Sequence, residues 1–383
     1  MIRNRVRAAA ALTLSASLAA GAAAASILPA ANAAGLSSRA YFNDPDADGA
    51  NTIRYLVKNR FDGAPSGSTA RVVMFNIDDD YIMDAMVAAK RRGVNVKVIV
   101  AKSRCDNVAR LRGAFGTDRS RGSWVYCSPG STRSEGGNVH QKSITFSRTG
   151  NTPYVTLVGS ANLTEEGWRD QWTDMFQYAN RKDVYTAYNN VFAVQAKGAS
   201  LPSPYRSWTA ADGVARANFF PVNDETPEAA DDPVLTRLNN LPSNRNTTII
   251  VANYATHGSR GSWLVNALIA KKRAGATVQF ISGPPTDDGL ERRMRSAGIP
   301  VTRAFDASCA TVATHVDGTC NYIHLKGMTA KYWADGTWNY RSYTGSDNWS
   351  NAGLNNDEVT QRIGGQSAYD QYVAVFRKIQ NRY

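Results

Sequence analysis

The sequence has little of what defines several classes of protein. Its 383 residues include only four cysteines and four histidines, too few and too scattered for a disulfide-packed domain or a cysteine zinc site. Beyond the N-terminal region, no segment approaches the roughly 18 continuous apolar residues of a transmembrane helix. Apolar residues make up 43% and charged residues 20%, which is a globular composition. The length suits two domains or one large one.

The first 33 residues have the pattern of a secretory signal peptide. Arg3, Arg5 and Arg7 precede a run rich in Ala, Leu and Ser, and residues 31–33 form an A-x-A cleavage site. A retained membrane anchor is the alternative, although Gly21 and the alanines make a weak hydrocarbon span. We therefore expect a secreted mature chain with 41 basic and 32 acidic residues, a net charge of +9. Such a basic surface could hold nucleic acid, anionic lipid or a cell wall.

The cysteines are expected to pair, because an exported chain meets an oxidising environment. Four cysteines allow three pairings. We expect Cys105 to pair with Cys127 and Cys309 with Cys320, since these pairs close short loops of 22 and 11 residues. Neither pair is expected to be essential for folding, because the chain is long enough to form a large apolar core.

The chain contains an internal duplication, because several features recur at nearly one offset. The recurring features are a helix-Gly-strand segment at Gly93 and Gly275 (182 apart), His140-x-Lys142 and His324-x-Lys326 (184), Gly159-Ser160-x-Asn162 and Gly345-Ser346-x-Asn348 (186), and Tyr185, Tyr188 and Phe192 with Tyr369, Tyr372 and Phe376 (184). Chance matches do not keep register over so long a stretch, so the chain is predicted to have two homologous halves.

Each half is predicted to be an α/β-layered lobe. Apolar runs such as 72–75 and 249–252 suit interior strands of a sheet that is covered on both faces. A Pro-containing, acidic stretch separates the halves. The predicted organisation is a signal peptide at 1–33, an N-terminal lobe at 34–200, a linker at 201–233 and a C-terminal lobe at 234–383. A pseudo-twofold axis would bring the two motif copies together at the interface between the lobes.

The duplicated motifs carry the expected chemistry. The candidate catalytic residues are His140, Lys142, Asn162, His324, Lys326 and Asn348, and Gly159, Ser160, Gly345 and Ser346 support them in the two turns. With a pKa near 6.5, one histidine can be a neutral nucleophile while the other is a protonated acid. Lysine and asparagine side chains can offset charge on the phosphoryl oxygens. The set suits a phosphodiester and needs no metal or cofactor.

This pattern resembles the phospholipase D superfamily, whose hallmark is H-x-K-x4-D followed by G-S-x-N, present twice in its bilobal members. The resemblance extends from about Tyr41 to Tyr383. It implies a two-step displacement through a phosphohistidine intermediate. By analogy with the family, His140 is the nucleophile and His324 the general acid and then base, although the sequence alone permits the reverse.

The resemblance has one departure and implies one further pair of residues. Both motif aspartates are missing, because Ser147 and Lys331 occupy their positions. Family members place an acidic residue after G-S-x-N that orients the histidine. Glu358 lies 34 residues after His324 and Asp174 lies 34 after His140, so both are candidates. The match is firmer for Glu358. If Gly167 is aligned with Gly353, the residue opposite Glu358 is Trp172 and not Asp174.

The residues near the motifs leave the substrate class open. Five of the eight tryptophans flank the two catalytic segments, namely Trp168, Trp172, Trp333, Trp338 and Trp349. Rings at a cavity mouth would suit a phospholipid at a membrane or micelle interface, but they could also stack on nucleic acid bases or belong to the core. We expect a monomeric, secreted phospholipase D that hydrolyses glycerophospholipid head groups, with head-group exchange as a further activity. The alternatives are a secreted nuclease and an inactive binding homologue.

Overall fold

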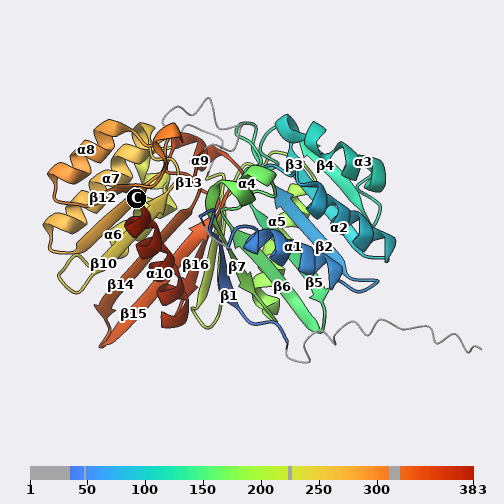
Figure 1. Cartoon of the computed structure of the whole chain (residues 1–383), viewed down its shortest axis with the longest axis horizontal. Helices are drawn as coiled ribbons and strands as arrows, with labels where there is room; N and C mark the ends of the chain where they lie inside the picture. The colour runs from blue at the N-terminus through green and yellow to red at the C-terminus, as the bar shows by residue number, and fades with distance from the viewer. Residues whose placement is uncertain (1–34, 47–48, 223–226, 310–319) are drawn as a thin grey trace, which may run out of the picture. The chain divides into compact units, whose positions relative to one another are not determined.

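A computed structural model describes residues 35–46, 49–222, 227–309 and 320–383. The expected signal peptide at 1–33 therefore lies outside the described residues. Strands and helices alternate along the chain and build two mixed sheets, each covered by helices (Figure 1). The expected α/β fold with two similar lobes is confirmed.

The first sheet has the strand order β1-β7-β6-β5-β2-β3-β4, and β13 adds to β7. Its strands are β1 (Arg39–Asn43), β2 (Thr69–Met74), β3 (Asn95–Ala101), β4 (Trp124–Ser128), β5 (Ser143–Thr149), β6 (Thr152–Gly159), β7 (Gln171–Tyr178) and β13 (Tyr322–Ile323). The strands β2, β3 and β4 run parallel, whereas β1, β7, β6, β5 and β2 are joined by antiparallel pairing.

The second sheet repeats this arrangement with the order β12-β11-β10-β14-β15-β16-β9-β8. Its strands are β8 (Arg206–Thr209), β9 (Ala215–Phe219), β10 (Thr248–Asn253), β11 (Thr277–Ser282), β12 (Val301–Arg303), β14 (Lys326–Ala334), β15 (Thr337–Gly345) and β16 (Val359–Gly364). Strand β9 holds the position that β1 holds in the first sheet. The segment 201–233, which was expected to be a linker, thus contains two strands, and Ala215, Ala217 and Phe219 of β9 are buried in the core.

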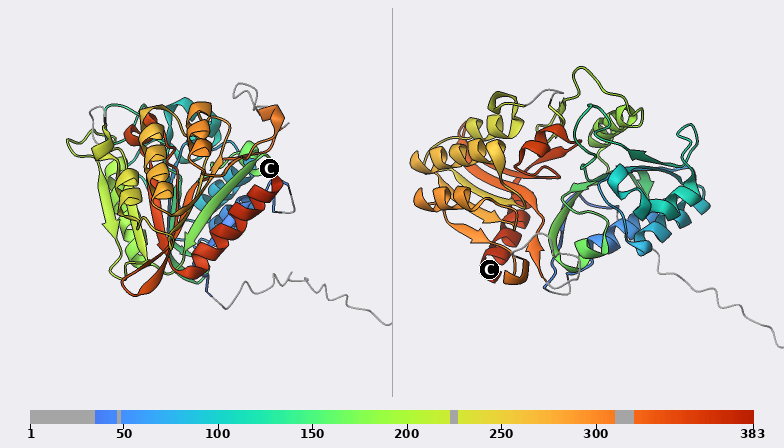
Figure 2. Two further views of the ribbon diagram at one scale, coloured as in Figure 1. Left: turned by 90° about the vertical axis from the view of Figure 1, so that its left-hand side faces the viewer. Right: turned by 90° about the horizontal axis from the view of Figure 1, so that it is seen from above.

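The helices cover the outer and inner faces of the sheets. They are α1 (Thr52–Asp62), α2 (Asp80–Arg91), α3 (Ala109–Phe115), α4 (Glu165–Arg169) and α5 (Lys182–Gln195) in the first lobe, and α6 (Pro233–Asn240), α7 (Gly258–Arg273), α8 (Asp288–Ser296), α9 (Asn351–Asn355) and α10 (Gln366–Arg382) in the second. We define each lobe as one sheet with these helices. Viewed from above, α1–α3 and α6–α8 lie on the sides of the sheets that face away from each other (Figure 2). Among the described residues, no helix is long and apolar enough to span a bilayer.

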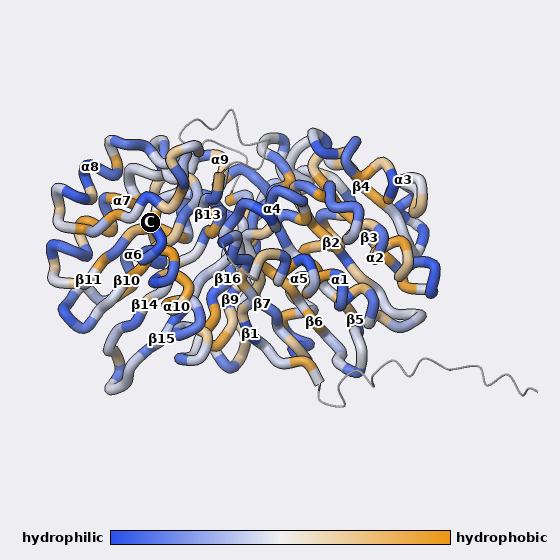
Figure 3. The backbone as a smooth tube through the Cα atoms, viewed as in Figure 1, coloured by the Kyte–Doolittle hydropathy of each residue, from blue (hydrophilic) through white to orange (hydrophobic). Residues whose placement is uncertain are grey.

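Local sequence explains why these elements form. Asp79 caps α2 by accepting a hydrogen bond from the Tyr81 N–H, and Asp287 caps α8 in the same way through Leu290. Gly93 and Gly275 follow α2 and α7 with φ angles of 97° and 101°, which a glycine adopts without strain. Apolar residues are concentrated in the strands, and polar residues in the loops (Figure 3). The sheets are therefore buried on both faces, as the apolar runs predict.

One apolar cluster joins the two lobes. It combines Trp172 and Phe176 of β7 and Tyr188 of α5 with Val359 of β16 and Tyr372 of α10, all of which are buried. Hydrogen bonds also cross this interface: for example, the Tyr188 hydroxyl donates to Gln361 Oε1 at 2.8 Å, and Gln361 Nε2 donates to the Tyr178 hydroxyl at 2.9 Å. This packing fixes the motif-bearing ends of both sheets against each other.

Both expected disulfides are present, Cys105–Cys127 and Cys309–Cys320. The first joins the segment after β3 to β4. The second spans residues 310–319, which lie outside the described part of the chain. Disulfides of this kind are typical of extracellular and periplasmic proteins.

Candidate active site

The two motif copies meet at one edge of the interface. His140 and Lys142 directly precede β5, and His324 and Lys326 lie at the equivalent start of β14. Each Gly-Ser turn follows the strand next to it, β6 or β15, and short helices α4 and α9 come after the turns (Figure 1). The strands therefore deliver both motifs to the same edge, as the duplication predicts.

Each histidine is anchored to the opposite lobe through its backbone. The His140 N–H donates to the carbonyl of Asp357 at 3.0 Å, and the His324 N–H donates to the carbonyl of Trp172 at 2.9 Å. The contacts are reciprocal, since His140 belongs to the first lobe and His324, which lies just before β14, belongs to the second. Neither histidine can be positioned by one lobe alone.

The two imidazole rings have different partners. Nδ1 of His140 lies 2.7 Å from Oε1 of Glu358, a carboxylate of the opposite lobe. Nδ1 of His324 lies 3.1 Å from the backbone carbonyl of Ser160. An ionised carboxylate and a carbonyl can only accept, so each Nδ1 donates and each Nε2 of a neutral ring carries a lone pair. Only His140 has a carboxylate that would stabilise positive charge on its ring.

The lysines and asparagines are arranged symmetrically. Nζ of Lys142 donates to the carbonyl of His140 at 2.7 Å, and Nζ of Lys326 donates to the carbonyl of His324 at the same distance. Because each ammonium group spends one hydrogen on this bond, two remain for a ligand. The Oδ1 atoms of Asn162 and Asn348 are buried and have no hydrogen-bond partner in the described part of the protein.

Two aromatic residues that sequence reasoning missed form the walls of the site. Phe75 follows β2 and its ring centroid lies 5.1 Å from that of His140, while Tyr254 follows β10 and lies 4.7 Å from His324. Nζ of Lys142 also lies over the Phe75 ring, and Nζ of Lys326 over the Tyr254 ring. The equivalent places of Phe75 and Tyr254 in the duplication could have revealed them.

Burial strongly affects the ionisation of this site. It lowers the pKa of Lys142 to about 7 and lowers the pKa of Lys326 well below its ordinary range. Burial also lowers the pKa of both histidines, and further positive charge from the two lysines lowers that of His324. Burial alone would raise the pKa of Glu358, but His140 and Lys142 outweigh it and lower that pKa. The carboxylate is therefore ionised beside His140.

The Gly-Ser turns show which residues of the two lobes are equivalent. The Ser160 N–H donates to the Asp174 carbonyl and the Ser346 N–H to the Val359 carbonyl, both at 3.0 Å. A Cβ on Gly159 or Gly345 would lie 2.1 or 2.0 Å from these same carbonyl oxygens, so only glycine fits. Asp174 thus corresponds to Val359, which places its neighbour Thr173 opposite Glu358.

The geometry separates the two acidic residues that the sequence treats as a pair. Asp174 is buried and accepts from the hydroxyls of Ser160 at 2.6 Å, Tyr372 at 2.7 Å and Thr344. Burial raises its pKa, and it makes no hydrogen bond to a histidine among the described residues. Thr173 holds the place of Glu358, but its Oγ1 is buried without a hydrogen-bond partner in that same set. The site is therefore asymmetric.

Two buried arginines hold the second motif and Glu358 in place. Arg260 of α7 forms ion pairs with Asp232 and with Asp347, the variable residue of Gly-Ser-x-Asn, and donates to the Asn348 carbonyl at 2.8 Å. Arg133 of the first lobe contacts Asp357, the residue before Glu358, with Nε and Oδ1 3.1 Å apart. These ion pairs are hard to predict from the sequence. In each pair only the aspartate lies inside or next to a recognised motif residue, and nothing in the sequence points to its arginine partner.

The tryptophans do not form the expected cavity mouth. Trp168, Trp172 and Trp349 are buried, so they belong to the core. Trp333 and Trp338 are 43% and 40% exposed, but they pair with each other near the turn between β14 and β15, at the end of the hairpin that lies away from Lys326. Trp333 lies seven positions along β14 from Lys326, a distance of about 23 Å.

The comparisons with known proteins find one family model for part of the chain and similar folds among solved structures. A family model described as "Cardiolipin synthase, PLD-like domain" matches residues 60–194, the region of the first motif copy. This part of the chain is therefore similar to the PLD-like domains that the model describes. A search with the sequence finds no match among curated proteins. Among the described residues, no three His, Cys, Asp or Glu side chains gather as metal ligands.

Two solved structures resemble the chain in fold. Phosphatidylserine synthase from Haemophilus influenzae Rd KW20 has a TM-score of 0.59 at 12% identity, covering 90% of this chain and 87% of that one. Polyphosphate kinase from Porphyromonas gingivalis has a TM-score of 0.54 at 15% identity over 90% of this chain, which matches about half (51%) of the kinase. At this identity the likeness concerns the fold, which both lobes share.

Proposed function

We propose that this protein is a secreted phospholipase D of the phospholipase D superfamily, which cleaves the head group from a glycerophospholipid and leaves phosphatidate. The observation that carries the proposal is the single carboxylate–histidine pair, Glu358–His140, set across the interface from His324. A lipid substrate is favoured because the matching family model is described as a cardiolipin synthase domain and one similar structure is a phosphatidylserine synthase.

The proposed reaction begins with the neutral His140. Its Nε2 attacks phosphorus and forms a P–N bond, and Glu358 stabilises the positive charge that develops on the ring. The bond from phosphorus to the head-group oxygen breaks, and His324 donates a proton to that oxygen. Water then attacks the phosphohistidine, His324 accepts its proton, and the P–N bond breaks. Replacing water by another alcohol would exchange the head group.

Protonation of His324 depends on the substrate in this scheme. Its pKa is lowered by burial and by the neighbouring positive charges of Lys326, Lys142 and His140. A phosphodiester anion bound between the lysines would counter those charges and raise the pKa again. The same anion would return Lys142 to its charged form. Substrate binding and acid formation are thereby coupled.

A secreted nuclease is the second candidate, favoured by the net charge of +9 expected for the mature chain. Incubating the protein with phosphatidylcholine vesicles, plasmid DNA and bis(4-nitrophenyl) phosphate, each with EDTA, tests both. We expect choline release and, with added ethanol, phosphatidylethanol. Nicking of plasmid without choline release would favour the nuclease, and binding without turnover of any substrate would favour an inactive homologue. The His140→Asn variant controls for contaminating enzymes.

A further inference from the structure

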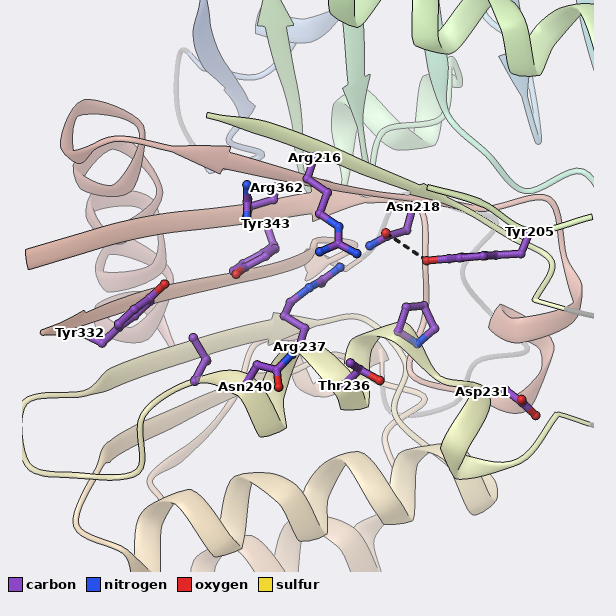
Figure 4. Close-up of a pocket in the computed structure, with 12 residues that line it drawn as sticks. Tyr205, Arg216, Asn218, Asp231, Thr236, Arg237, Asn240, Tyr332, Tyr343 and Arg362 are labelled. Atoms are coloured by element: carbon purple, nitrogen blue, oxygen red, sulfur yellow. Dashed lines mark hydrogen bonds between the residues drawn. The ribbon is translucent and has the colours of Figure 1, made fainter. Parts of the chain in front are cut away.

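A second polar cavity lies in the second lobe, next to the candidate active site. Its volume is about 370 Å3, within the range of roughly 300–1,000 Å3 that is usual for small-molecule sites. It lies between α6 and the strands of the second sheet (Figure 4). Its most prominent lining residues are the arginines Arg216, Arg237 and Arg362 and the tyrosines Tyr205, Tyr332 and Tyr343. We call it the arginine pocket.

Strand register forces like charges together in the arginine pocket. Tyr343 of β15 is paired with Arg362 of β16, and Arg362 is paired in turn with Arg216 of β9. Like charges directly opposite in an antiparallel pair destabilise a sheet. Arg237 of α6 adds a third guanidinium group, which stacks 4.4 Å from the Tyr343 ring centroid and points toward Arg216 (Figure 4).

No direct ion pair neutralises this positive charge within the described ranges. The carboxylates of Asp347 and Asp232 interact with Arg237 only through their charge, because both form ion pairs with Arg260. Asp231 lies at the far side of the pocket, away from the guanidinium groups (Figure 4). Arg237 donates to Thr360 Oγ1 at 2.8 Å, and Arg362 donates to the Gly213 carbonyl at 2.7 Å. Nε of Arg362 is buried and has no partner in the described structure.

The first lobe shows that the fold does not require such a cluster. Leu157 of β6 corresponds to Tyr343, and Gln177 of β7 corresponds to Arg362. The first sheet therefore has an uncharged residue at the position where the second sheet has Arg362. Helix α1 has 11 residues and its Phe61 packs on Phe146, whereas α6 has only 8 residues. The shorter helix leaves the same face of the second sheet uncovered, and arginines line the space.

The arginine pocket shares a wall with the candidate active site. A narrow cavity of about 20 Å3 is bordered by Arg237, Tyr343 and Thr360 and also by Lys326. Thr360 and Arg362 are two residues apart on β16, a distance of about 7 Å. A ligand in the pocket would thus lie close to the second motif without contacting the histidines.

We propose that the arginine pocket binds a phosphate monoester dianion. Guanidinium groups pair with phosphate through two parallel hydrogen bonds, and three of them suit a doubly charged group better than a singly charged one. Such an anion would relieve the repulsion between Arg216 and Arg362 and supply an acceptor for the Arg362 Nε. The monoester can belong to a soluble molecule or to a lipid head group. The proposal does not depend on catalytic activity.

Calorimetric titration of the full chain with glycerol 3-phosphate tests this site. We expect the double variant Arg216→Gln/Arg362→Gln to bind at least about tenfold more weakly. The matched control is Arg39→Gln, because Arg39 of β1 corresponds to Arg216 and faces the neutral Gln177. It should bind like the natural protein, and so should Lys142→Met, which alters only the active site.

Two further arms make the result decisive. Co-sedimentation with phosphatidate vesicles, compared with phosphatidylcholine vesicles, distinguishes a lipid head group from a soluble monoester as the source of the phosphate. If the double variant fails to fold in thermal unfolding, the single exposed change Arg216→Gln replaces it, with a smaller loss expected. Unchanged binding in the arginine variants, or binding lost only in Lys142→Met, would overturn the proposal, as would no binding to either form of phosphate.

Discussion

Replacing Glu358 by Gln removes a charge from the site while it keeps the size of the side chain. The carboxylate is 1% exposed and lies 2.7 Å from Nδ1 of His140. Glutamine can still accept that hydrogen bond, but it cannot stabilise a cationic ring. Hydrogen bonds to charged groups contribute about 1.5–3 kcal/mol. At about 1.4 kcal/mol per factor of ten, kcat/KM for bis(4-nitrophenyl) phosphate should fall about 10- to 150-fold.

The pH profile distinguishes this role from a structural one. Glu358 raises the pKa of His140, so Glu358→Gln lowers it. If His140 must be neutral to attack, the acid limb of kcat/KM follows that pKa and moves to lower pH. The matched control is Thr173→Val at the equivalent place in the other lobe, where the hydroxyl has no described partner, and its kinetics should be unchanged. An acid limb that stays in place in Glu358→Gln would refute the role.

Four further results are expected. His324→Ala should lower turnover of phosphatidylcholine by about two to four orders of magnitude, but much less for an aryl ester whose leaving group needs no proton; equal losses would contradict its role as the acid. Because burial lowers the pKa of Lys142 to about 7, its ammonium form is lost as pH rises, and kcat/KM should decline above about pH 7. Replacing Cys105 and Cys127 together by Ser should cost about 3 kcal/mol in urea unfolding. Arg260→Met should cost about 3–5 kcal/mol, because it leaves buried carboxylates unpaired.

Local patterns in the sequence were sufficient to predict the repeated lobes, both disulfides and the meeting of the motifs. Each of these depends on residues near one another in the chain or on an offset that repeats. The pair of Arg133 and Asp357 joins residues 224 positions apart, and no repeat marks it. Strands β8 and β9 were also missed. Their segment is Pro-rich and polar, and it forms strands because β9 pairs with β16, which the local sequence does not indicate.

The two acidic residues show how counting along the chain can mislead. Asp174 and Glu358 each lie 34 positions after a histidine, so the sequence makes them equivalent. The Gly-Ser turns shift that comparison by one residue, and in a strand a shift of one residue moves a side chain to the opposite face. Asp174 consequently faces Ser160 and Tyr372, while Glu358 reaches His140 across the interface. The carboxylate therefore serves one histidine only, and two lobes with the same motif present two histidines in different electrostatic surroundings.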